Sequence, residues 1–99
     1  MVTKGLYVAF EAKPGLEGAV ADFLKAGLSI VNKERDTTAW FALEMGPAKF
    51  GIFDVFEKED GRDFHLNGDL AKLLFSRADE LFSSPPVVQK LDVIASKLP

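Results

Sequence analysis

The chain has 99 residues, of which 47% are hydrophobic and 27% are charged, and we expect one globular domain over residues 1–99. Its net charge is −3, and acidic and basic residues are interspersed along the chain, which argues against a nucleic-acid-binding surface. There is no cysteine, no segment approaches the roughly 20 apolar residues of a membrane span, and the N-terminal residues do not resemble a secretory signal, so we expect a cytoplasmic protein with no membrane contact.

The first elements in chain order are a strand and a helix. Residues Lys4 to Ala12 alternate between apolar and other side chains, which is strand periodicity, and Lys13-Pro14-Gly15 stops the strand. From Leu16 to about Arg35 the apolar residues recur at helical spacing, which predicts an amphipathic helix about five turns long. Because glycine weakens a helix interior, Gly18 and Gly27 indicate that this helix approaches another element closely.

A hairpin is expected next. Thr38 to Met45 is rich in β-forming residues, and Lys49 to Lys58 returns as a second strand after a turn at Gly46-Pro47. In both strands the two alternating sets of side chains are apolar. One set can pack on helices, and the other needs a partner, so we expect a homodimer that joins two sheet faces.

The last elements are helices and a closing strand. A short helical stretch is expected around Gly61 to Leu66, interrupted at Asn67-Gly68, and a second amphipathic helix from Asp69 to Phe82. Pro85-Pro86 blocks further helix, and Val87 to Ser96 supplies the final strand. The order β-α-β-β-α-β predicts an α+β, ferredoxin-like fold, with two helices on one face of a four-stranded antiparallel sheet.

The only histidine is the first candidate for proton chemistry. His65 follows the strand that carries the single acid Asp54, after a charged turn. No other side chain of this chain has an unperturbed pKa between 5 and 8. We therefore take His65 as the candidate catalytic residue.

Several of these features resemble a known family. They are Lys13-Pro14-Gly15 after the first strand, Asp54, the aromatic Phe56 two positions later, and His65 followed by Leu66. Together with the order of elements over nearly the whole chain, they resemble the antibiotic biosynthesis monooxygenase superfamily of dimeric α+β barrels. Its members include cofactor-independent oxygenases of quinols and aromatic polyketides, and haem-degrading enzymes.

The haem-degrading branch does not fit the residues. Its asparagine, tryptophan and histidine positions correspond to Tyr7, His65 and Phe75, so none of the three is retained. Without a histidine at Phe75 the expected iron ligand is missing. The quinol and polyketide branch fits better, because its members often carry a histidine where His65 stands and an aromatic residue where Trp40 stands.

The resemblance thus implies a cofactor-independent monooxygenase that acts on a small aromatic or quinol substrate with O2. Such chemistry needs a base, a hydrogen-bond partner for the oxyanion and an apolar enclosure, and it needs neither metal nor flavin. His65 would be the base and Tyr7 or Asn67 the hydrogen-bond partner. The enclosure would be aromatic: Trp40, Phe50, Phe56 and Phe75.

Each residue also has a structural interpretation. His65 could instead hydrogen-bond a backbone carbonyl or Asp54 and hold the turn. Asp54 lies on an apolar strand, where an unpaired carboxylate is costly, so a structural bond to Tyr7, Arg35 or the loop near His65 is an alternative to a binding role. Trp40 could belong to the sheet core or to the dimer interface. The corresponding alternative function is a non-catalytic homodimer that is structural or binds a small apolar ligand.

An acidic turn precedes His65, and we do not expect a metal site there. Its acids have no second histidine nearby in the sequence, and such turns are usually solvated. They are Glu57, Glu59, Asp60 and Asp63.

Overall fold

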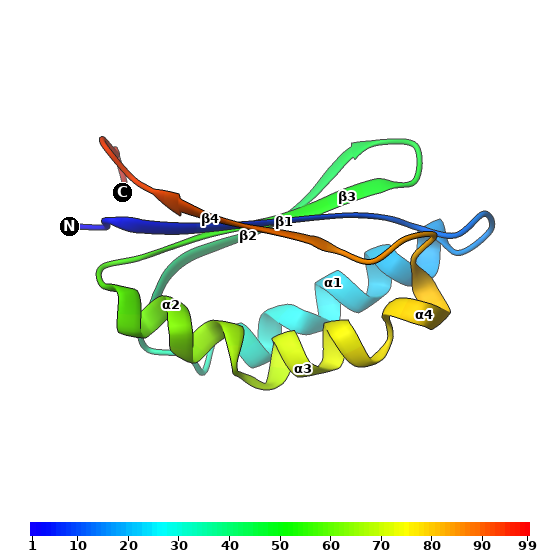
Figure 1. Cartoon of the computed structure of the whole chain (residues 1–99), viewed down its shortest axis with the longest axis horizontal. Helices are drawn as coiled ribbons and strands as arrows, with labels where there is room; N and C mark the ends of the chain where they lie inside the picture. Colours follow the sequence, from blue (N-terminus) through cyan, green and yellow to red (C-terminus); the bar gives the residue numbers. More distant parts are fainter.

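The computed structural model describes residues 1–99 and contains one four-stranded antiparallel sheet, in the order β2-β3-β1-β4, with every helix on the same face (Figure 1). This confirms the predicted ferredoxin-like fold. No helix is both long and apolar enough to cross a bilayer. The elements are β1 (Lys4–Glu11), α1 (Glu17–Val31), β2 (Thr37–Gly46), β3 (Lys49–Phe56), α2 (Glu59–Leu66), α3 (Asp69–Ser76), α4 (Ala78–Leu81) and β4 (Val87–Asp92).

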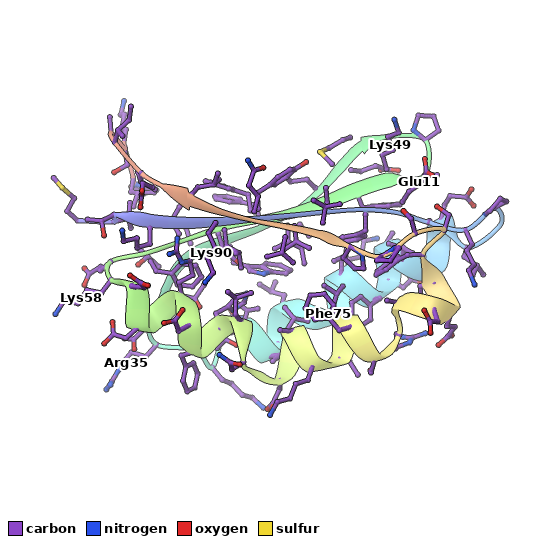
Figure 2. The ribbon with its side chains drawn as sticks, viewed as in Figure 1. Glu11, Arg35, Lys49, Lys58, Phe75 and Lys90 are labelled. Carbon is purple, nitrogen blue, oxygen red and sulfur yellow. The ribbon has the colours of Figure 1, made fainter.

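The core lies between the sheet and the helices. The two central strands pair antiparallel, with Val8 opposite Ile52 and Phe10 opposite Phe50, and these side chains are buried beneath the helices. Figure 2 shows side chains from both layers filling the space between them. Fully burying one such side chain is worth about 1.5 to 3 kcal/mol, so this layer holds the helices on the sheet.

Helix α1 is shorter than the periodicity predicted. It ends at Val31 rather than near Arg35, and the N–H groups of Lys33 and Glu34 donate to carbonyls only three residues back, at Ile30 and Val31. Such bonds tighten the end of a helix into a turn. Glu34 therefore lies in the connection from α1 to β2, and this places its side chain against α2.

The second helical region is broken twice. The predicted interruption at Asn67-Gly68 is confirmed, but the helix expected from Asp69 to Phe82 divides at Arg77 into α3 and α4. The Arg77 guanidinium lies 5.5 Å from the ring centroid of Phe23 on α1 and also pairs with Glu80.

Two strands are shorter than predicted. Strand β3 ends at Phe56 and strand β4 ends at Asp92.

The two helical glycines differ in their surroundings. A Cβ atom on Gly27 would lie 3.0 Å from Leu70 Cδ1, so the predicted close approach is confirmed and joins α1 to α3. A Cβ atom on Gly18 would meet nothing within 4 Å. The prediction of a close approach was wrong for Gly18, because this part of α1 faces solvent.

The sheet face turned away from the helices is apolar, as the two apolar sets of β2 and β3 predicted. Phe41 is 50% exposed and Val87 is 66% exposed on this face, which we call the outer face. An apolar surface of this kind is typical of an interaction site. Alternation and register assign to it Tyr7, Phe41, Leu43, Met45, Phe53, Val55, Val87 and Leu91.

Candidate functional site

His65 lies in the last turn of α2 and faces the sheet. Helix α2 starts three residues after β3, so its inward side chains return over the strand that precedes it. The ring of His65 packs 5.5 Å from the ring of Phe56, measured between centroids. The residue is only 5% exposed, so its ionisation is governed by the loss of hydration and by neighbouring side chains.

Two carboxylates flank this imidazole. His65 Nε2 lies 2.9 Å from Oδ2 of Asp54 on β3, and Nδ1 lies 2.5 Å from Oε1 of Glu34 in the α1–β2 connection. The Asp54 side chain is fully buried, and that of Glu34 is 8% exposed. We call Glu34, His65 and Asp54 the buried array. The expected alternative contact between His65 and Asp54 is thus present, as an ion pair.

The surroundings of the array raise the pKa of His65 and of Asp54. Burial alone would lower the pKa of His65, but the adjacent Asp54 and Glu34 outweigh it and raise the pKa above 6.5. Burial raises the pKa of Asp54 above 3.8, although His65 opposes this. With an imidazolium between two carboxylates, the array carries one net negative charge. It can therefore accept one further proton.

The buried end of the array holds polar atoms without a hydrogen-bond partner. Neither carboxylate oxygen of Asp54 accepts a hydrogen bond of ordinary geometry, so its contact with His65 is an ion pair. Trp40 is directly opposite Asp54 across β2 and β3, and its Nε1 is buried without a partner. Because buried polar groups are normally paired, these atoms mark the interior near Asp54 as unusual.

A small apolar cavity lies beside the imidazole, between the sheet and the helices. Its volume of about 20 Å³ is roughly the space of one water molecule. Phe75, labelled in Figure 2, lies at its wall and is 45% exposed. The lining residues are Leu6, Val8, Ile52, His65, Leu66, Leu70, Ala71, Leu74 and Phe75.

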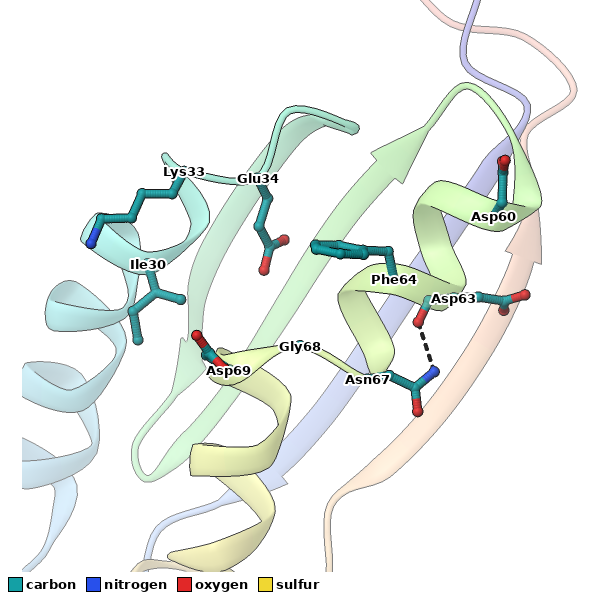
Figure 3. Close-up of a pocket in the computed structure, with 9 residues that line it drawn as sticks. All are labelled: Ile30, Lys33, Glu34, Asp60, Asp63, Phe64, Asn67, Gly68 and Asp69. Carbon is teal, nitrogen blue, oxygen red and sulfur yellow. Dashed lines mark hydrogen bonds between the residues drawn. The ribbon is translucent and has the colours of Figure 1, made fainter.

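A larger groove opens on the other side of the array. It has a volume of about 640 Å³, and Glu34 lines it together with the exposed Phe64. Figure 3 shows the Glu34 carboxylate directed between α1 and α2, with the Phe64 ring turned toward it. The lining residues are Ile30, Lys33, Glu34, Asp60, Asp63, Phe64, Asn67, Gly68 and Asp69. Glu34 thus connects the buried array with the surface.

The structure brings some of the predicted site residues together and separates others. Asp54, Phe56 and Trp40 lie with His65 on the helix-facing side of the sheet. Tyr7 lies on the outer face, where its hydroxyl donates to Met45 Sδ at 3.0 Å. Tyr7 therefore cannot serve the same enclosed space as His65.

The other predicted oxyanion partner, Asn67, lies in the groove. Its side-chain amide donates to the backbone carbonyl of Asp63 at 2.8 Å, as the dashed line in Figure 3 shows. Asn67 does not line the small cavity beside His65. The enclosure around that cavity is mainly aliphatic rather than aromatic, because Trp40, Phe50 and Phe56 do not line it.

Sequence reasoning missed two residues of this region. The helical spacing puts Glu34 in the last turn of the predicted helix, and no local pattern indicates its contact with a histidine 31 positions later. Arg62 is 6% exposed, and its Nη1 donates to the carbonyls of Gly5 and Leu91. The three-residue spacing of Arg62 and His65, which puts both on one helix face, was the only available signal.

The arrangement can hold or transfer a proton in a place that excludes water. No group of three or more metal-binding side chains is arranged to hold a metal ion. The array itself offers acid–base chemistry next to an apolar wall.

Solved structures of other proteins are similar to this chain. No family model and no curated protein matches it. A protein of unknown function from Nitrosomonas europaea is 52% identical over 100% of this chain and 96% of that protein, with a TM-score of 0.97. A Mycobacterium tuberculosis protein is 16% identical, with coverage of 95% and 97% and a TM-score of 0.84.

A structure named antibiotic biosynthesis monooxygenase is 13% identical to the chain, with coverage of 93% and 99% and a TM-score of 0.78. At this identity the likeness concerns the fold. It confirms the resemblance to that superfamily at the level of the fold. The chain therefore belongs to the same family as the Nitrosomonas europaea protein of unknown function, and it has the fold of the antibiotic biosynthesis monooxygenases.

Proposed function

We propose that the protein is a cofactor-independent monooxygenase that acts on a small aromatic or quinol substrate. The observation that carries this proposal is the buried array, because burial of three titratable groups costs stability and such groups with perturbed pKa values are concentrated at functional sites. Its net negative charge gives it the capacity to take a substrate proton. The fold is shared with proteins that are named monooxygenases.

In this reaction the array removes the hydroxyl proton of the substrate. The substrate O–H bond breaks, the array takes the proton, and the electron pair stays on the substrate oxygen. The anion then gives one electron to O2, and the two radicals recombine. Recombination forms a C–O bond, and the resulting peroxide takes back the proton held by the array. When the C–H proton of that carbon is lost, the O–O bond breaks: the inner oxygen stays as a quinone carbonyl and the outer oxygen leaves as water, so the substrate supplies all the electrons. An apolar wall suits this step because it excludes water from the radicals.

The proposed enzyme is a homodimer that assembles through the outer face. This face carries exposed Phe41, Met45 and Val87, and the helices cover only the opposite side. A second copy of the same apolar face would bury these side chains in a symmetric contact. The stability of a 99-residue domain would also gain from this contact.

Oxygen uptake with a panel of quinols and dihydroxyaromatic compounds tests the activity. We expect the wild-type protein and Leu73→Ala, a change on the exposed surface of α3, to consume O2 with at least one member of the panel. His65→Ala should lose this activity while it keeps its circular dichroism spectrum and its oligomeric state. Equal turnover in folded His65→Ala would overturn the proposal.

A non-catalytic homodimer that binds a small apolar ligand is the second candidate. Two observations favour it: the cavity beside His65 is only about 20 Å³, and both ring nitrogens face carboxylates. A quinol would have to displace side chains such as Leu66 and Phe75. This candidate predicts a ligand-dependent rise in melting temperature with the same panel, without any oxygen uptake.

A further inference from the structure

We propose that Glu34 is the proton exit of the buried array and that it exchanges protons between His65 and water in the groove. The inference deepens the proposed function, on which its role in turnover rests. Proton exchange itself can be measured without turnover. The geometry that carries it is a single carboxylate that contacts the imidazole and also lines the surface groove.

The other sides of the array are closed to water. Nε2 of His65 faces Asp54, whose side chain is 0% exposed. The cavity that His65 lines has the volume of about one water molecule, and its other residues are all apolar. A proton therefore has no polar route from His65 to solvent along these two sides. The remaining ring nitrogen, Nδ1, faces Glu34.

Glu34 is held in position to receive that proton. Its Oε1 accepts a hydrogen bond from the Thr37 hydroxyl at 2.9 Å and lies 2.5 Å from Nδ1 of His65. On the groove side, a Cβ atom on Gly68 would lie 3.3 Å from Glu34 Oε2, so the backbone at Gly68 leaves just enough room for this oxygen. Figure 3 shows the carboxylate between Gly68 and Phe64.

The proton moves only between atoms that are already in contact, His65 Nδ1 and Glu34 Oε1. The N–H bond at His65 Nδ1 breaks and an O–H bond forms at Glu34 Oε1, which leaves a neutral imidazole and a carboxylic acid. The acid then gives its proton to a water molecule in the groove, and the reverse steps reload the array. The charged groups around this path are Asp54 on β3, Arg62 on α2, and Lys33, Asp60, Asp63 and Asp69 in the groove.

Nuclear magnetic resonance can follow this exchange directly, because His65 is the only histidine. The probe is the rate at which its Nδ1 proton exchanges with water. Glu34→Gln keeps an oxygen that accepts the hydrogen bond but cannot take the proton. We expect this variant to slow exchange several-fold. Asp69→Asn, which neutralises a groove carboxylate that does not contact His65, should keep the wild-type rate.

The variant Glu34→Asp separates proton transfer from packing. It restores a carboxylate on a shorter side chain, so it should recover part of the rate that Glu34→Gln loses. Backbone amide exchange of α2 reports local opening in every variant. Wild-type exchange in folded Glu34→Gln, or equal slowing in Glu34→Asp and Glu34→Gln, would overturn the inference. If Glu34→Gln does not fold, the Nδ1 exchange rates of wild type and Glu34→Asp are each compared with the opening of α2. Exchange faster than α2 opening supports the exit through Glu34, and exchange that only follows α2 opening contradicts it.

The two proposals fail differently. A wild-type protein that consumes no O2 but shows slow exchange in Glu34→Gln retains the proton exit and loses the oxygenase function. Oxygen uptake that depends on His65, together with unchanged Nδ1 exchange in Glu34→Gln, would retain the oxygenase function and reject the proton exit. If both proposals hold, Glu34→Gln lowers kcat and leaves KM unchanged, because Glu34 does not line the cavity beside His65.

Discussion

His65 Nε2 lies 2.9 Å from Asp54 Oδ2 in the interior of the domain, where the aspartate side chain has no contact with solvent. The pair joins α2 to the sheet strand β3. Through Nδ1 the same imidazole binds Glu34 and so joins the α1–β2 connection to both. The His65 side chain thus links α2, β3 and the α1–β2 connection. Its protonation state therefore affects the stability of the fold.

The stability of the protein should fall as the pH rises above neutral. A His65 pKa raised above 6.5 means that the folded state binds this proton more tightly than the unfolded chain does. The resulting stability is fully present below pH 6.5 and is lost as the pH rises through the raised pKa. Urea unfolding at several pH values up to about pH 9 measures the decline.

The Asp54 carboxyl also makes the stability of the protein fall as the pH rises. Its raised pKa means that stability falls as the pH rises from 3.8 through the higher folded value. Between pH 6.5 and about pH 9 the decline should be absent from His65→Gln, which cannot bind the proton. A decline of equal size in wild type and His65→Gln would show that another group causes it.

Neutralising Asp54 should lower the pKa of His65. Asp54 makes the largest contribution that raises this pKa, and burial of the imidazole opposes it. In Asp54→Asn the side chain keeps its size but loses its charge. Burial of the imidazole, which lowers the pKa of His65, is then opposed less strongly, and this pKa falls. Titration of the single histidine by nuclear magnetic resonance measures the change. Asp92→Asn, a variant of the exposed partner of Lys4, is the control and should leave this pKa unaltered.

Two glycine substitutions should change stability in opposite directions. A Cβ atom at residue 68 would lie 3.2 Å from the carbonyl oxygen of Phe64 and 3.3 Å from Glu34 Oε2. Overpacking against backbone is costly, so Gly68→Ala should lower the free energy of unfolding by about 1 to 3 kcal/mol. Gly18→Ala meets open space on α1 and should raise it by about 0.5 to 1 kcal/mol. Urea unfolding compares both variants, and a stable Gly68→Ala would contradict the close packing.

A charge on the outer face should dissociate the proposed homodimer. Phe41 is half exposed on β2, and Phe41→Asp would bring two carboxylates into a symmetric apolar contact. We expect analytical ultracentrifugation to give a dimer for wild type and a monomer for this variant. Phe64→Asp, a matched change on the helix side of the protein, should remain dimeric. Dimers of Phe41→Asp would place the interface elsewhere.

Much of the fold could be predicted because local patterns determine it. The alternation in Lys4 to Ala12 groups Val8 and Phe10 on one face of β1, and the Asn67-Gly68 interruption separates α2 from α3. The end of α1 could not be placed, because no glycine or proline follows Val31 to stop the helix. The break at Arg77 had no such signal either.

The candidate site could be predicted only in part. His65 and Asp54 were recognised because one is the only histidine and the other is an isolated acid on an apolar strand. Glu34 was missed because its contact depends on where α1 ends and on packing between distant segments. Tyr7 was placed near His65 because strand periodicity does not reveal which sheet face carries the helices.

The ionisation of His65 tests the central claim most directly. A nitrogen-15 spectrum of the wild-type imidazole, recorded as a function of pH, reports whether each ring nitrogen carries a proton. The buried array predicts that both nitrogens still carry a proton at pH 6.5, the usual midpoint of histidine, and lose this state only as the pH rises further. An imidazole that is mainly neutral at pH 6.5, with one bare nitrogen, would contradict the charged array and the proton path through Glu34.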